Sequence, residues 1–142
     1  MSLPPISFYF NKNDPEFKTF PITAQQSPYI GHWFITAPLY NSSGVKIGYK
    51  ASDDYIQQIS DNQYLIRLNN IYYIDGQGTI TWNYAFINNN PNPYYPDGTV
   101  AKSNIVSTTG NYLGTSGIVS LTPQKDGRRD VTINFSTIRL LE

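Results

Sequence analysis

The chain has 142 residues, a formal net charge of zero and a pI of about 6.6, and 14% of its residues are charged. This balance argues against broad electrostatic contact with nucleic acid or with an acidic membrane surface, since both need clustered lysine and arginine. The absence of cysteine excludes disulfides, thiolate metal sites and a cysteine nucleophile.

Composition indicates one all-β domain, and the length suits a single domain with a core of its own. Twelve tyrosines raise the aromatic content to 15%, and tyrosine, isoleucine and threonine favour the half-buried surface of a strand. The first residues lack a basic segment and a long apolar run, and no stretch reaches the length of a membrane span. We therefore expect a soluble, intracellular chain without a signal peptide, whose host and compartment the sequence does not name.

Residues 1–30 are predicted to form an irregular N-terminal arm, and residues 31–142 the folded domain. Five prolines interrupt the arm, at positions 4, 5, 15, 21 and 28. The apolar run Ile6–Phe10 could form a short edge strand, cap the domain or reach a neighbouring subunit. A segment that lies along its own domain is the simplest of these interpretations.

The remaining chain predicts seven or eight antiparallel strands separated by short turns. Turn signals such as Asn-Ser-Ser-Gly at 41–44 and Asp-Gly at 75–76 divide the apolar runs. Many short strands in this arrangement are typical of a β-sandwich or a β-barrel. The predicted strands are His32–Tyr40, Val45–Ala51, Tyr64–Ile74, Thr79–Ile87, Thr99–Val106, Tyr112–Thr122 and Arg128–Leu140, and Tyr55–Ile59 is either a continued strand or one helical turn.

A period of two assigns the faces of two of these strands. In 45–51, Val45, Ile47 and Tyr49 are expected to face inward, and the lysines at 46 and 50 to face solvent. In 79–87 the alternation is the clearest in the chain, and one face carries Ile80, Trp82, Tyr84 and Phe86.

Glycines punctuate the stretch from 108 to 135. Those at 110, 114 and 117 lie within eight residues, and Asp-Gly at 126–127 marks a tight turn. Glycines with this spacing mark bends, or places where two backbones approach closely. Because a closed sheet needs such bends, we interpret this stretch as the seam of a small barrel. The arginines at 128 and 129 lie between Asp126 and Asp130, which favours a solvated hairpin over a phosphate site.

Several segments resemble the allene oxide cyclase and dirigent protein superfamily. The run Thr109–Val119 (TGNYLGTSGIV) resembles its glycine-rich segment. Leu39-Tyr40-Asn41 with Gly44 and Gly48 resembles a family hairpin, Gly31–Phe34 resembles a strand start, and Asp75–Phe86 resembles a later strand, over about residues 30 to 138. The resemblance implies an eight-stranded antiparallel β-barrel with a hydrophobic cavity, commonly assembled as a trimer. Family members cyclise a fatty-acid epoxide or guide the coupling of phenoxy radicals, without a metal or an organic cofactor in the barrel.

The chain departs from the family pattern where activity is concerned. Gly31-His32 stands where the family often has Gly-Asp, so an acidic residue used in dirigent chemistry is absent there. Thr109 replaces the glycine expected before Gly110, and no plant-type cyclase site is recognisable. The resemblance therefore supports the prediction of the fold more strongly than it supports any prediction of the activity.

A few polar residues are weak candidates for catalysis. His32, the single histidine, could act as a general base near neutral pH, but it lacks a partner at motif spacing. Asp53 and Asp54 could form an acid–base pair at a barrel rim, although turn chemistry also explains them. Arg67, with Asn69 on the same face, could bind a ligand carboxylate if that face lines the lumen, and would otherwise lie on a solvated face.

Aromatic residues supply the remaining candidates. Tyr94 and Tyr95 lie in a proline-rich loop, 88–98, that could contact a partner or pack on the barrel end. Four strand aromatics could line an apolar ligand pocket, and as core of a small barrel they fit equally well. They are Tyr49, Trp82, Tyr84 and Phe86.

The sequence favours a non-catalytic binding or structural protein built on this barrel. Its expected partners are a small apolar ligand and further copies of the same chain, and the resemblance implies a trimer. The alternative is a cofactor-free cyclase- or dirigent-like protein that acts on a small hydrophobic substrate in the lumen. A second alternative is a lectin-like module that uses Tyr94, Tyr95 and Trp82. No nucleic acid, membrane, metal or cofactor is expected. A lumen filled by aromatic side chains would oppose an enzyme or carrier.

Overall fold

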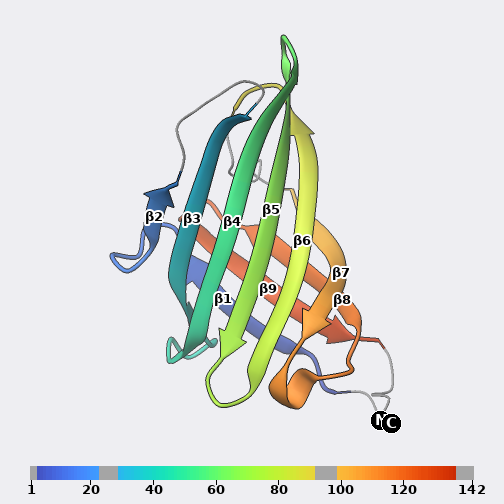
Figure 1. The fold of residues 1–142 in the computed structure, drawn as a ribbon. Helices are drawn as coiled ribbons and strands as arrows, with labels where there is room; N and C mark the ends of the chain where they lie inside the picture. Colours follow the sequence, from blue (N-terminus) through green and yellow to red (C-terminus); the bar gives the residue numbers. More distant parts are fainter. Residues whose placement is uncertain (1–2, 23–28, 92–98, 137–142) are drawn as a thin grey trace.

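The computed structural model describes residues 3–22, 29–91 and 99–136. Within these ranges the regular structure is nine strands and one 3-10 turn (Figure 1). They are β1 (Ile6–Asn11), β2 (Lys18–Pro21), β3 (Tyr29–Tyr40), β4 (Lys46–Ser60), β5 (Gln63–Ile74), β6 (Gly78–Asn88), β7 (Ala101–Thr108), η1 (Gly110–Tyr112), β8 (Gly117–Pro123) and β9 (Arg128–Phe135).

Eight of these strands form a closed antiparallel barrel, as the sequence predicts. The sheet runs β1-β9-β8-β7-β6-β5-β4-β3, and β1 pairs again with β3. The short β2 adds to the other part of the β3 edge, beside Trp33–Thr36. The long strands β3 to β6 stand on one side of the barrel and extend past β1, β8 and β9, which cross behind them (Figure 1).

The barrel closes between β1 and β3, and not at the glycine-rich stretch as the sequence suggested. Along β9, β1 pairs from Ile6 to Asn11, but it meets β3 through the single pair Tyr9–Tyr40. The Tyr40 hydroxyl also donates a 2.7 Å hydrogen bond to the carboxylate of Asp14, just beyond β1. This contact supports a junction that has few backbone hydrogen bonds of its own.

The glycine-rich stretch instead forms η1 and the turn into β8. Gly110 has φ of 66°, and a Cβ there would collide with the backbone of Gln77 and Gly78. The close approach of two backbones that the glycine spacing predicts is therefore present, at the turn that connects β5 and β6.

The N-terminal stretch is part of the barrel wall, although the sequence placed the domain start at residue 31. Prolines at 4, 5 and 15 flank β1 without entering it, so the run between them is free to pair. Phe8 and Phe10 face inward and are each 3% exposed. The strand therefore supplies both backbone pairing and core.

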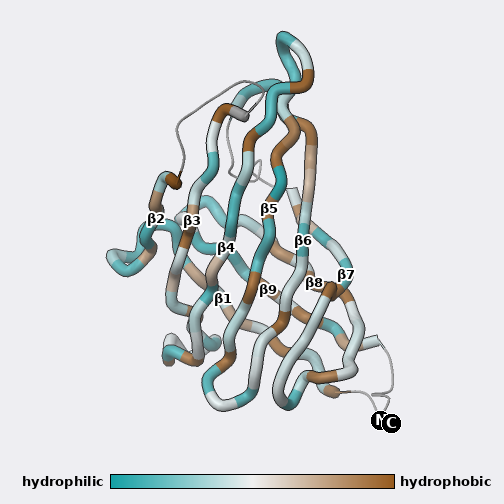
Figure 2. Tube along the Cα trace, in the orientation of Figure 1, coloured by the Kyte–Doolittle hydropathy of each residue, from teal (hydrophilic) through white to brown (hydrophobic). Residues whose placement is uncertain are grey.

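The interior contains two hydrophobic clusters. The smaller is built on Ile56, Ile66 and Leu68, with Trp33 and Phe86 packed against it. The larger joins residues from seven of the eight barrel strands and η1, and Ile47 of β4 packs against it. Figure 2 shows hydropathy changing repeatedly along the strands, as expected where alternate side chains enter the core. The larger cluster contains Phe8, Phe10, Ala37, Leu39, Tyr72, Ile74, Ile80, Trp82, Ala101, Tyr112, Val119, Leu121, Val131, Ile133 and Phe135.

From Tyr49 onward the inward face of β4 is the opposite of the one that alternation predicted, whereas Ile47 packs against the larger cluster as expected. Lys50 is buried, whereas Tyr49 is 48% exposed on the outer surface. Pairing with β5 explains the reversal, because Lys50 lies opposite Tyr72, whose ring is in the core. In the same row, the Cα of Gly48 lies against the Tyr73 carbonyl, where no side chain fits. The strand continues to Ser60, so Tyr55–Ile59 is strand and not a helical turn.

We expect Phe8→Ala to lower the free energy of unfolding by about 3–5 kcal/mol, because it empties a buried aromatic site in the core. Phe20→Ala on β2, whose side chain is 53% exposed, should change it by no more than about 0.5 kcal/mol. Urea denaturation followed by circular dichroism measures both. Equal effects of the two substitutions would contradict the assignment of β1 to the barrel wall.

Candidate functional site

A layer of polar side chains lies on the inner faces of β4, β5 and β6. Lys50, Ser52 and Asp54 alternate along β4, all buried. Across the β4–β5 pairing, Ser52 lies opposite Asn70, and Asn70 lies opposite Trp82 of β6. Residues opposite each other in adjacent strands have Cβ atoms about 4.5–5.5 Å apart on one face of the sheet. These side chains therefore share one region of the barrel interior, which we call the polar layer.

The polar layer is completed by Tyr72, which lies opposite Lys50 on β5. Residues of the larger hydrophobic cluster border it on one side: the Lys50 ammonium lies 4.4 Å from the Phe10 ring centroid, and Tyr72 meets Phe8 edge to face at 4.9 Å. On the other side, Leu68 and Ile56 begin the smaller cluster. Polar groups are thus enclosed between two apolar regions. The layer consists of Lys50, Ser52, Asp54, Asn70, Tyr72 and the indole N–H of Trp82.

Five buried polar atoms of this layer complete no hydrogen bond of normal geometry with the described residues. Ser52 lies near enough to Asp54, and Trp82 near enough to Tyr72, to influence the partner's pKa, yet neither contact is a full hydrogen bond. A buried polar group without a partner costs about 1–3 kcal/mol. The atoms are Ser52 Oγ, Asp54 Oδ1, Asn70 Nδ2, Tyr72 Oη and Trp82 Nε1.

Burial moves the pKa values of both charged groups on β4 toward neutrality. Removal from water raises the pKa of Asp54 from 3.8 to about 6, against the opposing effects of Lys50 and Ser52. Removal from water also lowers the pKa of Lys50 from 10.5 to about 8, with Asp54 opposing the shift and Arg129 adding to it. The two side chains interact across space without a direct ion pair. Each can therefore exchange a proton near physiological pH.

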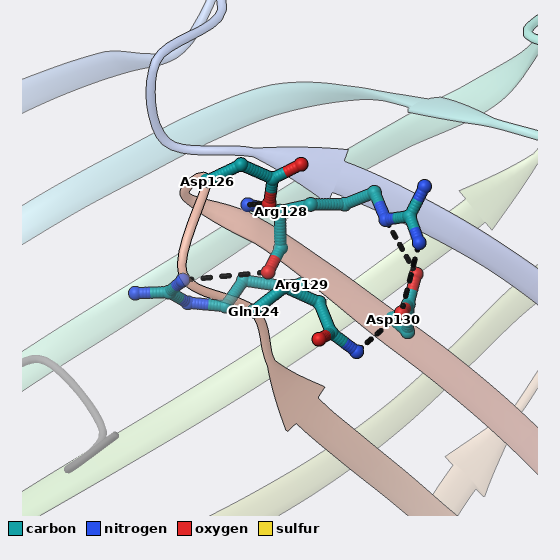
Figure 3. Close-up of polar contacts among 5 residues, drawn as sticks. All are labelled: Gln124, Asp126, Arg128, Arg129 and Asp130. Atoms are coloured by element: carbon teal, nitrogen blue, oxygen red, sulfur yellow. Dashed lines mark hydrogen bonds and ion pairs between the residues drawn. The ribbon is translucent and has the colours of Figure 1, made fainter. Parts of the chain in front are cut away.

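Arg129 is a second buried cation, although the sequence suggested a solvated pair of arginines. Figure 3 shows Arg128 and Arg129 pointing to different sides of β9. Arg128 pairs with Asp130 at 3.0 Å at the surface, and Gln124 donates to the same carboxylate at 2.8 Å. Arg129 is 5% exposed, and its guanidinium donates to the Arg128 carbonyl at 3.4 Å. The hairpin is solvated on one face only.

The structure places most of the polar residues named from sequence on the outside of the barrel, and Asp54 inside it. Arg67 and Asn69 lie on the outer face of β5, which corrects the lumen position considered for them, and Arg67 lies over the Tyr55 ring at 4.9 Å. Tyr55 of β4 lies between Arg67 of β5 and His32 of β3. The His32 ring stacks on the Tyr55 ring with the two centroids 4.0 Å apart, and His32 Nε2 is 3.5 Å from an oxygen of Asp53. Asp54 points inward, so the two neighbouring aspartates do not form a pair.

The aromatic candidates separate in the same way. Trp82, Tyr84 and Phe86 lie along the inner face of β6, with Trp82 and Tyr84 in or against the larger cluster and Phe86 against the smaller one. Tyr49 lies outside, in a shallow apolar groove of about 230 Å³ that Tyr73 also lines. Tyr94 and Tyr95 lie outside the described residues.

Sequence reasoning missed Lys50, Ser52, Asn70 and the inward direction of Asp54. A signal was present, because Lys50, Ser52 and Asp54 recur at every second position. Such a row ordinarily marks a solvent face. Gly48 lies in the same row, and a glycine within a strand is a signal of close backbone approach, as its contact with Tyr73 shows.

Among the described residues, no cluster of three or more histidine, aspartate or glutamate side chains is arranged to hold a metal ion. No helix in the described ranges is long and apolar enough to cross a bilayer.

Comparison with known proteins identifies the fold. No family model and no curated protein sequence matches the chain. Among solved structures, a pyocyanin demethylase aligns at TM-score 0.64 and 10% identity, covering 94% of this chain and all of that one. A pterocarpan synthase dirigent protein aligns at TM-score 0.57 and 15% identity, covering 98% and 88% of the two chains. The exo-specific intermolecular Diels-Alderase AbnU aligns at TM-score 0.53 and 14% identity, covering 94% and 98%.

The chain has the dirigent and cyclase barrel fold. This confirms the architecture that the glycine-rich segment and the hairpins indicated. At these identities the similarity concerns the backbone alone, and the side chains of the polar layer must be interpreted on their own.

Asp54 gives the fold a characteristic pH dependence. Because its pKa is higher in the folded than in the unfolded chain, its stabilising contribution is complete below pH 3.8 and is lost as pH rises through 6. We expect Asp54→Asn, relative to the wild type, to gain about 2–3 kcal/mol of unfolding free energy between pH 4 and pH 7. Urea denaturation at several pH values measures this difference. Asp61→Asn, at the exposed β4–β5 turn, is the control. If the plot of unfolding free energy against pH for Asp54→Asn runs parallel to that of the wild type, Asp54 is not the group responsible for the pH dependence.

Proposed function

We propose that the barrel binds a small molecule in its interior, one with an apolar body and an oxygen-containing polar group. The unpartnered atoms of the polar layer are the observation that supports this most directly. Five of them converge from three adjacent strands, and a ligand oxygen near them gains hydrogen bonds that the protein leaves unmade. The hydrophobic clusters on both sides would contact the apolar body.

The chemistry of the layer favours a ligand that accepts hydrogen bonds. Asn70 Nδ2 and Trp82 Nε1 are donors, and the hydroxyls of Ser52 and Tyr72 can donate as well. Lys50 adds a buried positive charge. Carbonyl, phenol and carboxylate oxygens suit these groups better than an amine does. The similar barrels carry names that denote action on small molecules, a demethylase, a dirigent protein and a Diels-Alderase, and this agrees with the proposal.

Asn70→Leu tests the binding proposal, because it removes a central donor and replaces it with an apolar group of similar size. We expect it to weaken binding by about tenfold, as one lost hydrogen bond to a ligand is worth about 1.4 kcal/mol. A panel of small apolar ketones, phenols and carboxylic acids is first screened by thermal shift. The compounds that stabilise the protein are then titrated by tryptophan fluorescence, for which Trp82 is a reporter within the layer.

Asn69→Leu is the matched control, since Asn69 is the next residue on the same strand and faces outward. It should leave affinity unchanged. The proposal fails if no compound stabilises the protein, or if both variants bind the panel as the wild type does.

Cofactor-free catalysis in the interior, of a cyclase or dirigent type, is a second candidate. Asp54 supports it, because a buried carboxyl with a pKa of about 6 can both donate and accept a proton near neutral pH. If the bound compound is also converted, Asp54→Asn should reduce turnover by about 100-fold or more with little change in affinity. Turnover is measured by chromatography of the product. If it is unchanged in this variant, Asp54 takes no part in the chemistry.

The remaining alternatives gain less support. A lectin-like surface that uses Trp82 is incompatible with its burial, since the side chain is fully enclosed and cannot stack on a sugar. Assembly into trimers stays a prediction from the resemblance. The outer groove beside Tyr49 and Tyr73 is the apolar surface on which such contacts would be expected.

A further inference from the structure

We propose that Lys50 forms a covalent imine with an aldehyde or ketone held in the polar layer. This inference rests on the proposed binding of a small molecule and names its reactive group. The observations are that the Lys50 amine is enclosed, that no carboxylate among the described residues forms an ion pair with it, and that Tyr72, which carries a hydroxyl donor, lies opposite it on the adjacent strand.

The surroundings of Lys50 favour the neutral, nucleophilic amine. Its ammonium lies over the Phe10 ring, and Asp54 is near enough to interact without forming an ion pair. Arg129 adds a second positive charge in the same region. Burial in an apolar site and a neighbouring cation are the two conditions that activate lysine toward carbonyl compounds. With a pKa of about 8, Lys50 has a substantial neutral fraction under mildly alkaline conditions.

The groups around the amine match the needs of the reaction. The Tyr72 hydroxyl comes from the residue opposite Lys50, and Asn70 and Trp82 lie in the next row, so their donors can hold the carbonyl oxygen. Asp54, on the same face of β4, can supply and recover the proton. Other described lysines, such as Lys46 and Lys102, are exposed and lack such an environment.

The proposed step is balanced without any further reactant. The Lys50 nitrogen attacks the carbonyl carbon to form a carbinolamine, in which the former carbonyl oxygen is a hydroxyl. Protonation of that hydroxyl by the Asp54 carboxyl lets it leave as water, and the nitrogen loses its remaining proton to the Asp54 carboxylate. One C–N double bond replaces one C–O double bond, and no oxidant or reductant takes part.

Reductive trapping tests the proposal. The full-length protein is incubated with benzaldehyde or hexanal and sodium cyanoborohydride, and intact-mass and peptide mass spectrometry locate the secondary amine. We expect modification of Lys50 to be about tenfold faster than modification of Lys102 near pH 8, because burial lowers the pKa of Lys50 to about 8 and leaves much of its amine neutral. Trapping at Lys50 should rise through pH 7–8, as its amine loses its proton.

The selective adduct should be abolished in both Lys50→Met and Lys50→Arg. The arginine variant keeps the positive charge, and it serves as the test if the methionine variant disturbs the packing. Circular dichroism confirms that each variant is folded. Equal labelling of all lysines, or no adduct at Lys50, overturns the imine proposal. Titration with benzyl alcohol and hexanol, which have similar apolar bodies but no carbonyl group, is run in parallel. If these bind while Lys50 stays unmodified, the binding function stands and only the covalent step is refuted.

Discussion

Closure of the barrel is the constraint on which the rest of the structure depends. It sends every second side chain of eight strands into one enclosed space, where unpaired polar atoms are costly. Most of these positions are filled by aliphatic and aromatic residues of the two hydrophobic clusters. The exceptions are concentrated on β4 and the strand beside it. A protein selected only for stability would place apolar side chains at Lys50, Ser52, Asp54 and Asn70, because apolar groups of similar size are often neutral or stabilising in such sites.

The proposed binding function would account for the polar layer. Strongly shifted pKa values and underpaired donors collect where a protein binds or transforms a ligand, and the stability they cost is retained for that purpose. The layer also divides the two clusters, so that the interior has an apolar, a polar and again an apolar zone. This order of zones suits an amphipathic small molecule whose polar group lies beside Asn70.

The sequence allowed the barrel to be predicted because its signals were local. Turns such as Asp75-Gly76, the alternation along 79–87 and the glycines from 110 to 117 each specify backbone geometry within a few residues. The inner face of β4 was beyond this kind of reasoning. Its orientation follows from pairing with β5, which is a property of two strands together. For the same reason Arg67 and Asp53 were considered for a site that lies on the other side of the sheet.

The single-pair junction of β1 and β3 has a consequence for how the chain is made. The main partner of β1 is β9, and Ser7 meets Thr132 across a separation of 125 residues. During synthesis β1 leaves the ribosome before the other described strands, and it must wait for β9, the last of them, before its edge and its two buried phenylalanines are covered. Contacts of such long range fold slowly and leave apolar strand edges exposed in the meantime. The N-terminal strand is therefore the segment of the nascent chain most in need of protection from aggregation.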